Sequence, residues 1–259
     1  MGVIDAPQWL LPAFVRSVHA VGGTADHDEV ERTAESLLER WNAPERRFHN
    51  LRHLVAVIAR VDELTEETHS PDLVRLAAWY HGAVFDAAAT TAARMRGGED
   101  ESASAEVAYR ELTDLGVPEK AADHVRHLVQ CLERHQADLS DPDTAVLCDA
   151  DLAMLAVEPQ RYRTYVEDLR AEYAHVPVRD FLEARQRILA KLLARRKLFV
   201  SPLSEGWEEP ARQNLAAELA RVTKELTRVE PAAATTTGSV ETATAAPGTA
   251  PAAGTAALS

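Results

Sequence analysis

His49 and His53 stand four residues apart at the start of an apolar stretch of the chain. If this stretch is helical, the spacing places both imidazoles on one face, within reach of a shared ligand. The two histidines would lie at the margin of the buried stripe, where a side chain can meet both a metal ion and solvent. That stripe is expected to contain Leu54, Val57, Ile58 and Val61. Paired histidines on a polar face are more often ordinary surface residues, so the metal interpretation depends on what else converges there.

Two further stretches place polar side chains among apolar residues. His81 projects onto the apolar face of a helix expected at 72–85, so we expect it to be buried with a partner, either a metal ion or a core carbonyl. Asp149 and Asp151 lie in a second apolar stretch, and because they are two residues apart only one of them can join a given cluster. Asp151 is the candidate ligand, and Asp149 is the alternative. A salt bridge is the structural alternative for such a carboxylate, with Arg126, Arg134 and Arg170 as candidate partners.

Two other polar stretches have sufficient structural explanations. The acidic residues from Glu99 to Glu101 precede or begin a helix, where negative charge interacts favourably with the helix dipole. His135 lies in the last turn of another expected helix, where a histidine is favourable for the same reason. Neither stretch indicates a function by itself.

Composition narrows the class of protein. The chain has 259 residues, of which 46% are hydrophobic and 27% charged, enough for one good core and a single main domain. A formal net charge of −13 argues against a nucleic-acid partner and against attachment to anionic lipid. No apolar run approaches the ~20 residues of a membrane span, and the N-terminus lacks the pattern of a signal peptide, so we expect a cytoplasmic protein. The two cysteines, Cys131 and Cys148, lack CxxC spacing and are expected to be reduced.

Helical periodicity extends from Gln8 to about Arg228, and no stretch alternates convincingly with a period of two. The expected helices are 8–20, 27–42, 50–66, 72–85, 101–115, 119–136, 143–156, 159–174, 179–199 and 209–229. Residues 87–98 are expected to form a loop over one end of the bundle. After Glu230 the chain becomes rich in Pro, Ala and Thr, a composition that cannot bury enough apolar surface to fold. We therefore expect an all-α domain over 1–230 and a disordered tail over 231–259.

The ordered set of these motifs resembles the HD superfamily of metal-dependent phosphohydrolases, which has an all-α fold. In particular, it is similar to a bacterial branch of predicted metal-dependent phosphohydrolases of that superfamily. The resemblance covers roughly 8–219. It is carried by Arg47-Phe48-His49-Asn50-Leu51-Arg52-His53, Trp79-Tyr80-His81, Glu99 to Ala103, His135, Asp149-Ala150-Asp151-Leu152, Arg170-Ala171-Glu172-Tyr173, Arg185 and Asn214-Leu215. The HNxxH motif also resembles the opening motif of cyclic-nucleotide phosphodiesterases, in which the first histidine donates a proton and the second binds metal.

The resemblance implies a helical bundle of the HD type and a role for each candidate residue. His53, His81 and Asp151 would bind a divalent metal ion, either Mn, Mg, Zn, Co or Fe. His49 would protonate the leaving oxygen after metal-activated water attacks phosphorus. Arg47 would assist catalysis by offsetting charge on the phosphoryl oxygens, and Arg52, Glu99 and His135 would contact a small phosphorylated substrate, a nucleotide or another phosphate ester. The alternative for Arg47 and Arg52 is that both are solvated surface residues.

One position departs from the pattern that names the superfamily. Its His-Asp pair is here His81-Gly82, and glycine has no side chain that could coordinate a metal. Asp86 is about one helical turn away, ~5–6 Å, too far for a simple replacement. We expect that Gly82→Asp would strengthen metal binding. The alternative function is a catalytically degenerate HD-like module that binds a ligand or regulates a partner.

Overall fold

The computed structural model describes residues 6–87, 99–135, 137 and 140–229. Within these ranges the chain forms ten α-helices and three short 3-10 helices, and it contains no β-strand. The α-helices are α1 (Leu10–Ala20), α2 (His27–Trp41), α3 (Leu51–Glu63), α4 (Pro71–Tyr80), α6 (Glu101–Asp114), α7 (Glu119–Cys131), α8 (Pro142–Leu152), α9 (Pro159–Glu172), α10 (Val178–Leu193) and α11 (Glu205–Leu226). The 3-10 helices are η1 (Thr65–Glu67), η2 (Ala153–Ala156) and η3 (Pro202–Ser204).

The all-α prediction is confirmed, and each of the ten expected helices is present. Several helix ends differ from the sequence prediction. The helix expected at 72–85 ends at Tyr80, so His81 follows α4 as its C-cap. The helix expected from 209 already begins at Glu205, so Pro210 lies inside α11, where it lacks the main-chain N–H of a regular helical hydrogen bond. The predictions of a loop at 87–98 and of a disordered tail at 231–259 concern residues that, apart from Ala87, lie outside the described ranges.

Helix α3 begins at a defined point because Asn50 caps it. The Asn50 side chain accepts a hydrogen bond from the Arg52 main-chain N–H at 2.8 Å, which satisfies one of the free donors at the helix start. The cap leaves His49 just before the helix and places His53 within its first turn. The two histidines therefore approach the site from a loop and from a helix.

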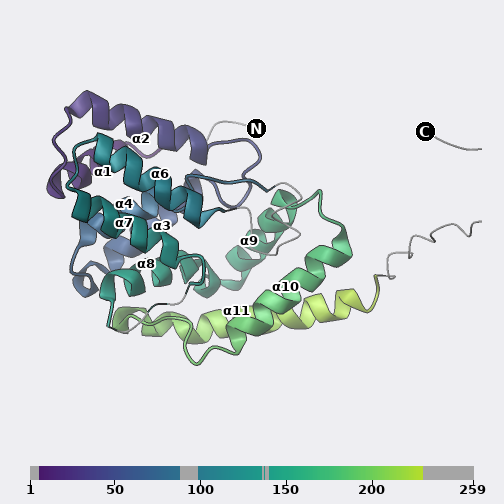
Figure 1. Ribbon diagram of the computed structural model, residues 1–259. Coiled ribbons are helices and arrows are strands. Elements are labelled where there is room, and N and C mark those ends of the chain that lie inside the picture. The colour runs from purple at the N-terminus through teal and green to yellow at the C-terminus, as the bar shows by residue number, and fades with distance from the viewer. Residues whose placement is uncertain (1–5, 88–98, 136, 138–139, 230–259) are drawn as a thin grey trace, which may run out of the picture.

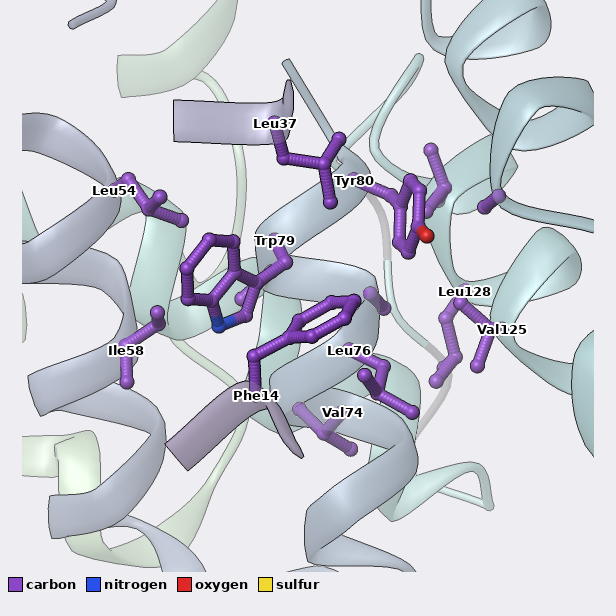
Figure 2. Close-up of a cluster of buried hydrophobic side chains, with 14 of the residues drawn as sticks. Phe14, Leu37, Leu54, Ile58, Val74, Leu76, Trp79, Tyr80, Val125 and Leu128 are labelled. Carbon is purple, nitrogen blue, oxygen red and sulfur yellow. The ribbon is translucent and has the colours of Figure 1, made fainter. Parts of the chain in front are cut away.

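Seven helices, α1–α4 and α6–α8, enclose the first hydrophobic core (Figure 1). Figure 2 shows its centre, where the ring of Phe14 packs against Trp79 and Tyr80 with ring centroids 4.9 and 6.2 Å away. All three side chains are buried. Since Trp79 and Tyr80 end α4, their packing fixes the position of His81, which follows directly.

The remaining three helices, α9–α11, form a second layer with its own hydrophobic cluster, and α10 and α11 lie side by side (Figure 1). A buried ion pair joins these two helices. Arg185 donates to both carboxylate oxygens of Glu218, at 2.9 and 2.8 Å, and the Tyr162 hydroxyl of α9 donates to the same carboxylate. The pair links all three helices of the layer. None of the described helices is both long and apolar enough to span a membrane.

Candidate metal centre

His53 and His81 meet through their Nε2 atoms, which lie 3.2 Å apart. Both side chains are buried. His81 Nδ1 lies 2.6 Å from the Ala78 carbonyl oxygen, so Nδ1 carries the proton and donates this hydrogen bond. The neutral imidazole then presents an unprotonated Nε2 toward His53. Burial lowers the pKa of His81, although Asp151 and Glu99 oppose the effect, which favours this neutral form.

Glu99 supplies a carboxylate to the two histidines. Its Oε1 lies 4.0 Å from His81 Nε2, and His53, His81 and Glu99 each offer a ligand atom within 4.8 Å of the other two. Glu99 reaches this position because its main chain pairs with that of Phe85, which places the start of α6 beside the end of α4. Glu99 Oε1 is buried and has no hydrogen-bond partner among the described residues. A buried carboxylate oxygen without a donor is unfavourable unless a cation lies nearby.

Asp151 approaches the same histidines from the end of α8. Its Oδ1 lies 3.1 Å from His53 Nε2 and 3.8 Å from His81 Nε2. Its Oδ2 accepts a hydrogen bond from His135 Nε2 at 2.6 Å. Burial disfavours the charged carboxylate, but the hydrogen bonds from His135 and His53 outweigh burial and hold the pKa of Asp151 well below its usual range. The expected convergence of His53, His81 and Asp151 is therefore present, and His135 contacts Asp151.

The donor set fits a divalent transition-metal ion. Two imidazole nitrogens and two carboxylates are the ligands that Zn, Mn, Co and Fe(II) bind in proteins. Ligand atoms that each lie ~2.0–2.2 Å from one ion can be at most ~4.4 Å apart. Four pairs of ligand atoms meet this condition, with distances from 3.1 to 4.0 Å: His53–Asp151, His53–His81, His81–Asp151 and His81–Glu99.

His49 lies beside this cluster and is held by Glu172. Its Nδ1 donates to Glu172 Oε1 at 2.5 Å, and its Nε2 lies 3.7 Å from Glu99 Oε2. Burial opposes protonation of the imidazole, but the charges of Glu99 and Glu172 outweigh it and raise the pKa of His49 to about 9. His49 is thus an imidazolium at neutral pH whose Nε2–H faces the cluster.

Glu172 has a role that the sequence did not reveal. Its Oε2 accepts the main-chain N–H groups of Arg47, Phe48 and His49, at 2.9, 3.1 and 3.0 Å. One carboxylate from the end of α9 therefore fixes both the loop before α3 and the His49 ring. The resemblance included the stretch around Glu172, but only the fold shows what this residue contacts.

The packing of Trp41 explains why residue 82 is a glycine. A Cβ atom built on Gly82 would lie 2.3 Å from Cη2 of Trp41, so the Trp41 ring occupies the space that a side chain at position 82 would need. Trp41 is fully buried, and its indole N–H donates to the Trp79 carbonyl oxygen at 3.0 Å. Arg46 packs over the Trp41 ring and donates to the Gly82 carbonyl oxygen at 2.8 Å. This packing argues against the expectation that Gly82→Asp would strengthen metal binding, because a side chain at position 82 would collide with the Trp41 ring.

Arg47 and Arg52 do not line the cavity that opens from the cluster. The expected phosphate contacts of Arg47 and Arg52 are not supported, because neither residue lines the cavity described below. Arg47 contributes its main-chain N–H to Glu172, and the Arg52 side chain is exposed. Arg52 directly precedes His53 in α3, and adjacent helical residues point about 100° apart, so Arg52 faces solvent when His53 faces the core.

Asp149, the alternative ligand, serves the fold instead. Its carboxylate accepts the main-chain N–H groups of Val200 and Ser201 and the Ser204 hydroxyl, at distances from 2.7 to 3.0 Å. It therefore anchors the segment that leads from α10 to α11. The alternative of a salt bridge to arginine holds for neither Asp149 nor Asp151 among the described residues.

The cluster opens into a cavity of about 850 Å³ between the two helical layers. His49, His53, Glu99, His135 and Asp151 line it on the side of the first core. The second layer supplies most of the other wall, from α9 and α10. This volume lies within the ~300–1,000 Å³ range of pockets that bind small molecules. The metal-compatible cluster can therefore be reached by a small ligand.

Comparisons with known proteins supply no family. No protein-family model matches the chain, and no curated protein matches it.

Proposed function

We propose that the protein is a metal-dependent phosphohydrolase that acts on a small phosphate ester, such as a nucleotide. The observation that carries the proposal is the convergence of His53, His81, Glu99 and Asp151 beside a cavity. Glu99 Oε1 is buried there and has no hydrogen-bond donor among the described residues. The resemblance of the motifs to the HD superfamily supports it. In this proposal Glu99 supplies the anionic ligand that Gly82 cannot.

Each residue of the cluster would have a defined part. A divalent ion, when bound, would polarise a phosphoryl oxygen and lower the pKa of water. His81 would be held as a neutral ligand by the Ala78 carbonyl, and His135 would orient Asp151 through their hydrogen bond. His49 would hold a proton at Nε2 for the leaving oxygen, since its Nδ1 is bound to Glu172.

A second function has an observation in its favour. The alternative is a degenerate module that binds a ligand or regulates a partner without turning over substrate. The Trp41 ring fills the space of the metal-binding Asp that the superfamily pattern places after the histidine, so this chain lacks that ligand. A metal-binding but inactive protein would support this alternative.

The first test is metal binding. Protein purified without chelators is subjected to elemental analysis and then, after metal removal, titrated calorimetrically with Mn²⁺, Zn²⁺, Co²⁺, Fe²⁺ and Mg²⁺. We expect one of the transition metals to bind and His81→Gln and Glu99→Gln each to weaken its binding at least tenfold. The control is Glu167→Gln, an exposed position on α9. Unchanged affinity in both site variants would contradict the proposed metal centre.

The second test separates an enzyme from a binding module. The metal-loaded protein is screened for hydrolysis of phosphate monoesters and diesters, and His49→Gln is compared with the unmodified chain. We expect a loss of ~10²–10⁴-fold in rate with metal affinity retained, as for removal of a general acid. A chain that binds metal and hydrolyses none of the esters would favour the degenerate module.

A further inference from the structure

Beside the polar side chains of the metal-compatible cluster, the wall of the cavity is largely apolar. Much of the wall is made by apolar and aromatic side chains, which come from the loop before α3, from η2 and from α9 and α10. These include Phe48, Leu155, Tyr165, Leu169, Phe181 and Ile188. Phe48 and Tyr165 meet edge to face with ring centroids 4.6 Å apart, so the two layers together form an aromatic wall directly beside His49 and His53. Such a surface favours an apolar or aromatic group of a ligand.

Among the described residues, the charges that line the cavity do not suit a second phosphate group. Arg185 is the buried arginine of the wall, and its charge is balanced by the two hydrogen bonds to Glu218. Arg195 also lines the cavity, but it donates to the main-chain carbonyls of Arg134 and His135. No other arginine or lysine among the described lining residues is buried.

The remaining acidic and basic lining residues are of both signs, and most of them are exposed. Arg134, Arg187 and Lys191 are exposed, as are Glu133 and Asp180. Mixed charges of this kind give little net attraction for a polyanion. A phosphate beyond the one at the cluster would therefore meet an apolar wall or a nearly neutral opening.

From this arrangement we infer that the substrate carries a single phosphate on a largely apolar or aromatic body, and that polyphosphates are disfavoured. The inference rests on the proposed function, which places the phosphate at His53, His81, Glu99 and Asp151. The apolar wall then holds the body of the ester. A hydrocarbon ring on that wall would gain the favourable free energy of leaving water. A second phosphate would lose hydration, and the one buried arginine among the described lining residues, Arg185, is already paired with Glu218.

Binding of phosphonates tests the inference without turnover, because their P–C bond is not hydrolysed. The metal-loaded protein is titrated calorimetrically with methylphosphonate, benzylphosphonate and α,β-methyleneadenosine diphosphate. We expect benzylphosphonate to bind at least tenfold more tightly than either of the other two. Equal affinity for methylphosphonate and benzylphosphonate, or tighter binding of the diphosphate, would overturn the inference.

A variant locates the preference on the apolar wall. Ile188→Asn, which removes apolar surface without adding a charge, should weaken benzylphosphonate binding at least tenfold and change methylphosphonate binding little. The control is Leu203→Asn, at an exposed position on η3 that does not line the cavity. Equal loss for both phosphonates in a folded Ile188→Asn protein would also contradict the inference. Failure to bind metal would overturn the proposed function itself, whereas metal binding without preference for benzylphosphonate would overturn only the substrate class.

Discussion

At the scale of single residues, the absence of a side chain at Gly82 has two explanations, the loss of a metal ligand and the packing of the core. In the sequence it is a lost metal ligand, because a superfamily pattern places Asp after the histidine. In the fold it is the space into which Trp41 packs, with Arg46 bound to the Gly82 carbonyl. The glycine is required by the core whether or not the cluster binds metal.

Substitution at Gly82 should therefore lower stability. Gly82→Ala would bring a methyl group within 2.3 Å of the Trp41 ring, and overpacking of this kind costs ~1–3 kcal/mol. The measurement is the free energy of unfolding from urea denaturation. The matched control is Gly206→Ala in α11, where an added Cβ meets nothing within 4 Å and the change should be neutral or stabilising by up to ~1 kcal/mol. Equal stability of Gly82→Ala and the unmodified chain would show that the Trp41 ring can move.

At the scale of elements, the last turn of α8 carries two aspartates with separate tasks. Asp151 faces the histidines, and Asp149 faces the segment between α10 and α11. Because the two residues are two positions apart, one helix contacts both the candidate site and the second layer. The position of α8 thus couples the site to the packing of the two layers.

Replacing Asp149 by asparagine should lower the free energy of unfolding. Asp149→Asn replaces one acceptor oxygen by an NH₂ group that faces the N–H donors of Val200 and Ser201. Leaving buried donors unsatisfied costs ~1–3 kcal/mol, which urea denaturation would measure. Asp114→Asn, at the exposed end of α6, is the control and should change stability by less than ~0.5 kcal/mol. An Asp149→Asn protein as stable as the control would contradict the anchoring role.

For the whole molecule, the site requires both layers. The metal-compatible residues come from the first seven helices and the segments that join them, whereas Glu172, which holds His49, comes from α9 in the second layer. The cavity lies between the layers and takes much of its apolar wall from the second. Neither layer alone would form the proposed site.

Residues 231–259 are expected to add nothing to the stability of this two-layer fold. The stretch is rich in Pro, Ala and Thr and has no aromatic residue, so it offers little apolar surface to bury. A chain ending at residue 230 should melt within about one degree of the full chain by differential scanning calorimetry. A decrease of several degrees would show that these residues pack on the folded domain.

The sequence determined the features that depend on neighbouring residues. Helical periodicity and the prolines predicted the ten helices, and the position of His81 among apolar residues predicted its burial. The spacing of Asp149 and Asp151 predicted that only one of them would face the histidines. These features follow from the 3.6-residue repeat of a helix, which the sequence displays directly.

Only the tertiary structure decided which distant residues meet. It assigned Asp151 to the histidines and Asp149 to Val200 and Ser201, brought Glu99 to His81, and filled the space beside Gly82 with Trp41. These contacts join segments that are far apart along the chain, and they depend on how whole helices pack against one another. Local periodicity fixes which face of a helix is buried, but it does not specify the partner that the buried face contacts.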